Sequence, residues 1–218
     1  MQQRDPAAAH TAFARRMNIY ANIHKGLRTM MTDTLATVGC VDVYDRTALD
    51  AACTSVLELC DACSSHLFHE NKFVHPAMEV CRPGSTAHIA AEHDEHLAAI
   101  AEIRAAVSEL CDVCRSPANE QAALELYRKL ALFVGENFVH MHVEHNRVLW
   151  ACYSDEELQK LEGRIVAAMP LAESLMFMRW MVPAMNPAER AMLLTGIQST
   201  APARVLSAVL DVVQPYLS

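Results

Sequence analysis

Apolar residues recur at steps of three and four along four long stretches of the chain, which is the spacing of one buried helical face. The predicted helices cover approximately residues 9–37, 46–76, 85–114 and 117–152. Gly39 and Pro76 are stop signals after the first and second stretches, and Ser116 followed by Pro117 is a start signal for the fourth. Short connections between long amphipathic helices predict an all-α, up-down-up-down four-helix bundle over residues 1–152.

Residues 153–218 are predicted to form a C-terminal helical extension. Ser154 and Glu157 have the spacing of a capping box that starts a helix, and Asn186 followed by Pro187 starts a later one. Methionine and aromatic residues in "MRWMVPAMNPAERAMLL" lie at helical spacing, which is typical of a packed core or of a homodimer contact.

Composition agrees with helices, because apolar residues make up 52% of the chain while aromatic residues make up only 6% and there are 6 glycines. The net charge of -8 and the lack of a Lys/Arg cluster argue against nucleic acid as a partner, since binding phosphates needs a basic patch. The sequence shows neither an apolar leader nor an uninterrupted apolar segment of membrane-spanning length. We therefore expect a soluble, cytoplasmic protein without a membrane partner.

Histidine and glutamate interrupt the apolar face of each predicted helix. The six residues are His24 on the first, His66 and Glu70 on the second, His93 on the third, and His140 and Glu144 on the fourth. Among these six residues, a histidine followed by a glutamate four residues later occurs twice, in two similar predicted helical hairpins, and such a pair projects from one face. Burying four imidazoles and two carboxylates together is costly without cations, so these residues predict a metal site.

The types of ligand narrow the metal. Imidazole and carboxylate without thiolate suit iron, manganese or zinc, and two glutamates that can each bridge two cations suit a dinuclear centre. The six residues supply about eight of roughly twelve positions around two six-coordinate ions, which leaves room for oxo, hydroxide or a small ligand.

The remaining histidines and the neighbours of the six residues are assigned by their positions on the helices. His10 is predicted to lie in an N-terminal tail. Solvated positions at flanks or outer faces are predicted for His69, His75, His88, His142 and His145. The residues predicted to support the metal-binding histidines from behind are Tyr20, Arg28 and Glu136, and core packing explains Tyr20 equally well.

A ferritin-like site would need Glu-x-x-His, which the chain lacks. The elements "IHKGLR", "HLFHENKFVHP", "AEHDEHL" and "FVHMHVEHNRVLW" instead resemble the hemerythrin-like, or HHE cation-binding, family over about residues 14–165. The resemblance implies a non-haem site of two iron ions, oxo- or hydroxo-bridged, with zinc or manganese as substitutes. It also implies that the protein engages O2, NO or peroxide, in a stress response or in sensing.

Three positions depart from that family. Its oxygen carriers have a second histidine on the third helix, where this chain has Leu97, with His96 one residue earlier. His96 would become a ligand only if the helix rewinds locally. Asn71 and His145 replace the second acid of a Glu-Glu pair and are expected to point away from the core.

Three function classes remain open from the sequence. The protein could bind O2 or NO reversibly, or it could be an enzyme that turns over peroxide, NO or another oxidant. A thiol-redox or zinc-binding protein would use the CxxC pairs Cys60–Cys63 and Cys111–Cys114. Those pairs are predicted at different levels of the helices and so cannot form one zinc site, and small buried hydrophobic residues are the favoured interpretation.

Overall fold

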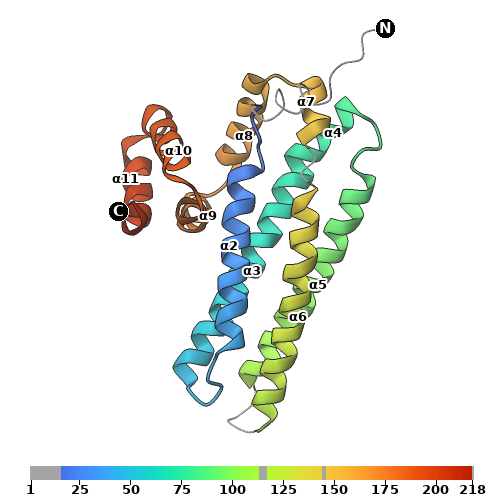
Figure 1. The fold of residues 1–218 in the computed structure, drawn as a ribbon, viewed down its shortest axis with the longest axis vertical. Helices are drawn as coiled ribbons and strands as arrows, with labels where there is room; N and C mark the ends of the chain where they lie inside the picture. Colours follow the sequence, from blue (N-terminus) through green and yellow to red (C-terminus); the bar gives the residue numbers. More distant parts are fainter. Residues whose placement is uncertain (1–15, 113–116, 144–145, 218) are drawn as a thin grey trace.

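The computed structural model describes residues 16–112, 117–143 and 146–217, and in these ranges helices joined by short connections form the structure, without a strand. Its first part contains α2 (Ala21–Gly39), α3 (Arg46–His69), a π-helical turn (Glu70–Val74), α4 (His75–Cys81), α5 (Ala87–Asp112), α6 (Pro117–His142) and α7 (Asn146–Cys152). Helices α2, α3, α5 and α6 lie side by side in alternating directions (Figure 1). Helix α2 packs against α3 and α6, and α5 packs against the same two, so each has two neighbours around a shared core.

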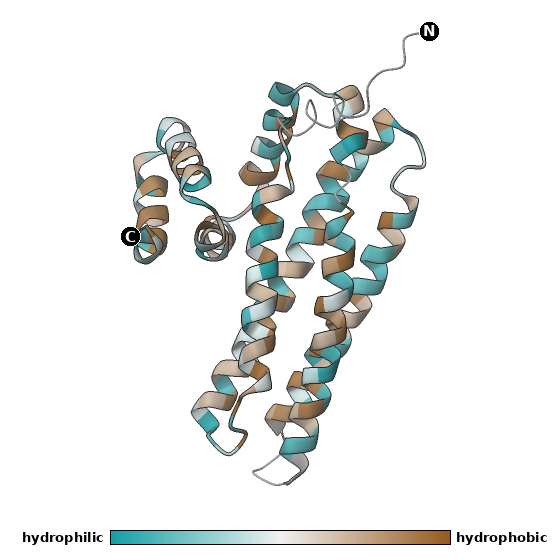
Figure 2. Cartoon of the chain, viewed as in Figure 1, coloured by the Kyte–Doolittle hydropathy of each residue, from teal (hydrophilic) through white to brown (hydrophobic). Residues whose placement is uncertain are grey.

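The core between these helices is built from large apolar side chains that are almost fully buried. They include Leu27, Met30, Met31, Leu59, Ile103, Leu130 and Phe133. Each contributes about 1.5–3 kcal/mol through removal of apolar surface from water. In Figure 2 the same helices carry both apolar and polar residues along their length, as amphipathic helices do.

Three helix boundaries differ from those that the hydrophobic periodicity predicts. Residues 16–20 are not α-helical, and α2 begins only after Asn18, whose Oδ1 accepts the backbone N–H groups of Tyr20 and Ala21. The second predicted helix continues past Pro76 to Cys81, because the π-turn accommodates the proline without ending the helix. The fourth ends at residue 142 and a separate helix starts at residue 146.

The C-terminal extension is helical, as predicted. It contains α8 (Asp155–Ala168), α9 (Leu171–Ala184), α10 (Pro187–Thr200), α11 (Ala203–Val213) and a 3-10 turn (Gln214–Tyr216). The capping box of Ser154 and Glu157 is formed, and Asn186 forms another with Glu189. No helix among the described residues is both long and apolar enough to cross a membrane.

The extension folds back on the first helix, where α9 packs against α2. Gly26 permits a close approach, since a Cβ there would lie 2.8 Å from Met181 Cγ and 3.1 Å from the Met181 backbone. Lys25 Nζ also lies 2.6 Å from Glu189 Oε1, joining α2 to α10. The extension therefore covers a face of α2 that would otherwise meet water.

Candidate metal centre

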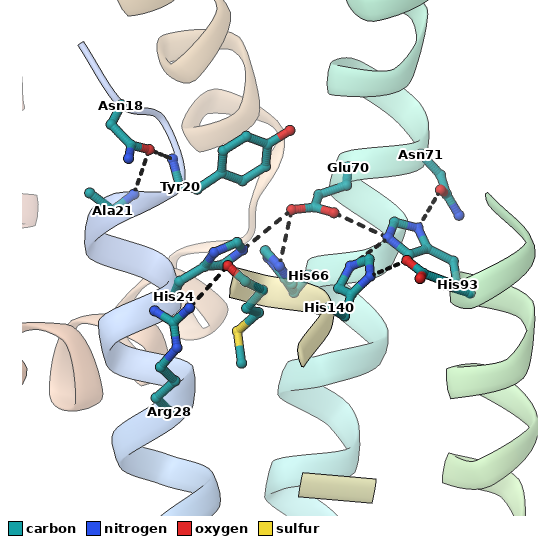
Figure 3. Close-up of polar contacts among 12 residues, drawn as sticks. Asn18, Tyr20, Ala21, His24, Arg28, His66, Glu70, Asn71, His93 and His140 are labelled. Carbon is teal, nitrogen blue, oxygen red and sulfur yellow. Dashed lines mark hydrogen bonds and ion pairs between the residues drawn. The ribbon is translucent and has the colours of Figure 1, made fainter. Parts of the chain in front are cut away.

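One buried carboxylate lies at the centre of the histidine cluster (Figure 3). Glu70 Oε1 lies 3.1 Å from His66 Nε2 and 3.7 Å from His24 Nε2, while Glu70 Oε2 lies 3.2 Å from His93 Nε2. The three histidines come from α3, α2 and α5, and their side chains are at most 10% exposed. The helices thus bring together four of the residues selected from the sequence.

His140 joins the cluster from α6, with its Nε2 3.3 Å from His93 Nε2. The outer nitrogens of both rings contact oxygen atoms: His93 Nδ1 lies 2.7 Å from Asn71 Oδ1, and His140 Nδ1 lies 2.8 Å from Glu92 Oε2. Oxygen acceptors hold the proton on Nδ1 and leave the lone pair of each Nε2 directed inward.

Two of the inward-facing atoms of the cluster lack a hydrogen bond within the part of the chain that the structure describes. Among the described residues, His66 Nε2 and Glu70 Oε1 form no hydrogen bond, although they lie 3.1 Å apart. Burial lowers the pKa of His140 and so favours its neutral form, which cannot supply a second proton. For Glu70, burial would raise the pKa, but His66, His24 and His93 outweigh it and hold that pKa well below the ordinary value. The site therefore presents an ionised carboxylate and several imidazole nitrogens to a common interior.

The prediction that His75 is solvated is wrong. His75 is buried and stacks on His93 with ring centroids 4.9 Å apart. In an α-helix residues five apart point about 140° away from each other, but in a π-turn they lie nearly above one another. The His75 N–H bonds to the Glu70 carbonyl in this i→i−5 pattern. The next residue, Pro76, has no N–H and so cannot return the helix to the i→i−4 pattern.

His69 is also buried, contrary to the prediction. Its Nε2 lies 3.0 Å from Glu173 Oε1, and Glu173 also accepts a hydrogen bond from Ser65. The face of α3 that periodicity assigns to solvent is covered by α9, which carries Glu173. His88 and His142 are exposed as predicted, whereas His10 and His145 lie outside the described residues.

His96 reaches the interior without local rewinding of α5, which is regular here, while Leu97 is 39% exposed. The His96 ring meets the His140 ring edge-on at 5.0 Å. Burial lowers the His96 pKa to about 4, so the ring is neutral at physiological pH. Its Nδ1 has no hydrogen-bond partner among the described residues.

The hydrogen-bonding partners behind the ligands differ from those predicted. Tyr20 stacks on His24, with ring centroids 5.1 Å apart, and its hydroxyl contacts Met78 Sδ, which agrees with a role in core packing. Arg28 instead donates to the carbonyl of Met141, and Glu136 is exposed. The partners found are Asn71 and Glu92, and Asn71 therefore does not simply point away from the site. A signal for Glu92 was its place directly before His93 in "AEHDEHL".

Two groups of three residues have ligand atoms within 4.8 Å of one another and could hold a metal ion: His24, His66 and Glu70, and Glu70, His75 and His93. Glu70 belongs to both groups. The predicted ligand Glu144 lies outside the described residues, two positions after the end of α6.

The first CxxC pair does not resemble a reactive thiol site. Cys60 and Cys63 are buried, and burial raises the pKa of Cys60 to about 11 and that of Cys63 further. Both thiols therefore stay protonated, which suits the predicted role as small hydrophobic residues. Cys111 is half-buried on α5, and Cys114 lies outside the described residues.

Comparison with protein-family models, with curated proteins and with solved structures gives no match to this chain. What can be said of its chemistry therefore comes from the site. A buried carboxylate shared by two histidine groups can bind two cations at once, with one oxygen atom directed to each.

Proposed function

We propose that this chain is a dinuclear non-haem iron protein, built as a hemerythrin-like up-down-up-down four-helix bundle, in which Glu70 bridges two ions. One ion would be held by His24, His66 and Glu70 Oε1. The other would be held by His75, His93 and Glu70 Oε2, with His140 beside them from the fourth helix of the bundle. Two iron ions in such a site would supply redox chemistry with O2, NO or peroxide.

The observation that supports this proposal most strongly is the spacing of the inward acceptor atoms. Two nitrogen or oxygen ligands that are each about 2.0–2.1 Å from one ion lie roughly 2.9–3.4 Å apart, for angles between octahedral and tetrahedral. The contacts from His66 and His93 to Glu70, and from His93 to His140, are 3.1, 3.2 and 3.3 Å. A shared proton satisfies one such contact, whereas cations satisfy all of them.

The chain's own groups hold the site ready for cations. Asn71 and Glu92 keep the protons of His93 and His140 on Nδ1, and the low pKa of Glu70 keeps its carboxylate ionised. The donor set favours iron over softer metals because it contains no thiolate. Each group of three protein ligands leaves positions for a small molecule, which is the basis for proposing O2, NO or peroxide as the ligand.

The test is metal analysis of full-length protein purified without oxygen from iron-replete cells. We expect about two iron ions per chain, and one ion or none would refute the dinuclear proposal. Glu70→Gln keeps the shape of the side chain but removes its charge, and should reduce the content below one ion. Glu136→Gln is the matched control because Glu136 is an exposed glutamate on α6, and it should keep both ions.

A second pair of variants separates the cluster from surface histidines. His66→Ala should reduce the iron content, whereas His142→Ala, at an exposed histidine, should not. Equal losses in both would mean that the iron is bound adventitiously. Optical spectra recorded before and after exposure to O2, NO or peroxide then identify the molecule that reacts.

A further inference from the structure

A cavity of about 130 Å³ lies beside the histidine cluster, between α2, the π-turn, α8 and α9. Its wall is mostly apolar, with contributions from Ile19, Ile23, Ile165, Phe177 and Met178. Neither the bundle helices nor the C-terminal extension encloses this space alone. The extension thereby forms one wall of this cavity, next to the proposed metal site.

The cavity is lined by both exposed and buried residues, some of them from the metal-binding cluster. Val166, on α8, is half exposed, whereas Tyr20 and Glu70 are buried. His66 lines the same wall. A molecule in the cavity would therefore meet the side of the cluster formed by His66 and Glu70.

Volume and polarity restrict what the cavity can take. An apolar protein cavity of about 150 Å³ stays dry and binds benzene or xenon, and 130 Å³ is close to that size. A diatomic gas would leave most of this space empty. Charged molecules would lose their hydration against the apolar wall. The two carboxylates on that wall do not offset this loss for an organic cation, because Glu70 would already be paired with the proposed metal ions and burial raises the pKa of Glu162 toward the neutral form.

We propose that this cavity binds one small, uncharged organic molecule of about the size of benzene and holds it against the His66 and Glu70 side of the metal centre. The inference rests on the proposed function for the metal, but the cavity is formed by the protein alone. It deepens that function by naming the class of substrate or effector that would approach the iron.

Binding can be tested with benzene as the probe on the metal-free, full-length chain carrying labelled isoleucine methyl groups. Ile19, Ile23 and Ile165 line the cavity, whereas Ile103 and Ile197 do not. Saturable shifts of the first three signals, with the other two unchanged, are expected. Shifts that are absent, unsaturable or shared by all five would overturn the inference, as would binding of xenon without binding of benzene.

Filling the cavity provides a second test. Ser174→Phe places a ring in the wall and should weaken benzene binding at least tenfold, while Ser199→Phe, at an exposed serine on α10, should leave it unchanged. Equal affinities in the two variants would refute the assignment. If Ser174→Phe does not fold, the methyl signals of the wild-type chain still decide the question.

Proximity to the metal is a separate measurement. Bound benzene protons should relax faster in protein loaded with iron(II) without oxygen than in zinc-loaded protein, because iron(II) is paramagnetic, and equal rates would place the molecule elsewhere. A chain that binds benzene but no iron would refute the proposed function and leave the cavity as a binding site. A chain that binds two iron ions but no benzene would refute only the cavity assignment.

Discussion

The hydrogen bond between Asn71 and His93 should control how tightly the second ion binds. In Asn71→Ala the Nδ1 proton of a fully buried ring loses its acceptor, and it can move to Nε2, where it removes the lone pair that faces the metal. Loss of such a supporting bond typically weakens metal binding by about 10–100-fold, or about 1.4–2.7 kcal/mol. Because Asn71 is exposed, water can partly replace the amide, so we expect a value near tenfold.

The assay is titration of iron or zinc into metal-free protein with a competing chelator, fitted to two sites. Asn71→Ala should weaken one site about tenfold and leave the other unchanged, whereas Asn71→Asp keeps an oxygen acceptor and should restore the affinity. Lys72→Ala, on the adjacent exposed residue of the π-turn, is the control for local disturbance. Equal weakening of both sites, or the same loss in Asn71→Asp as in Asn71→Ala, would refute the reasoning.

Three further predictions concern other parts of the chain. His75→Ala should lower the iron content of the loaded protein while His88→Ala, at an exposed position, leaves it unchanged; identical iron content would remove His75 from the site. Burial raises the pKa of Glu162, so its contribution to stability is present at low pH and is lost as pH rises through the folded-state pKa. The melting temperature of Glu162→Gln should therefore rise relative to that of wild type as pH increases above about 4.5. A difference in melting temperature that stays the same at all pH values would contradict this. Gly26→Ala should lower the melting temperature because its Cβ meets the backbone of α9, with an overpacking cost of about 1–3 kcal/mol. Gly163→Ala, in open space on α8, should raise the melting temperature. A rise in both variants would show that α9 can move away from α2 at little cost.

Much of the cluster could be predicted because two pieces of information are local in the sequence. The i,i+4 spacing of His66 and Glu70 fixes their common face, and the apolar stripes of the other helices place His24, His93 and His140 on inward faces. Helical content follows from the same stripes. These predictions need only the regular geometry of an α-helix, which the structure has at the four histidines. Glu70 is the first residue of the π-turn, but its N–H still bonds to the His66 carbonyl, so the two side chains share a face.

The residues that were missed depend on departures from that geometry or on contacts between distant segments. Periodicity places His75 at the surface because it assumes 100° per residue across the π-turn. It also places His69 there, because nothing local shows that α9 covers α3. Asn71 and Glu92 reach histidines on other helices, and the length and direction of a side chain are not encoded in a hydrophobic pattern.

The π-turn at residues 70–74 is equivalent to one extra residue within an otherwise continuous α-helix. Deleting Lys72 would let the chain close up into ordinary α-helix, with His75 four residues after Glu70 and therefore still at nearly the same angle, so that Met78 would also stay in the core. Deleting a residue from the regular part of α3 would instead rotate the residues on one side of the deletion by about 100° relative to those on the other, so that Leu59 and Glu70 could not both keep their places. The π-turn is therefore the segment of this helix in which the loss of one residue disturbs the ligands and the core least.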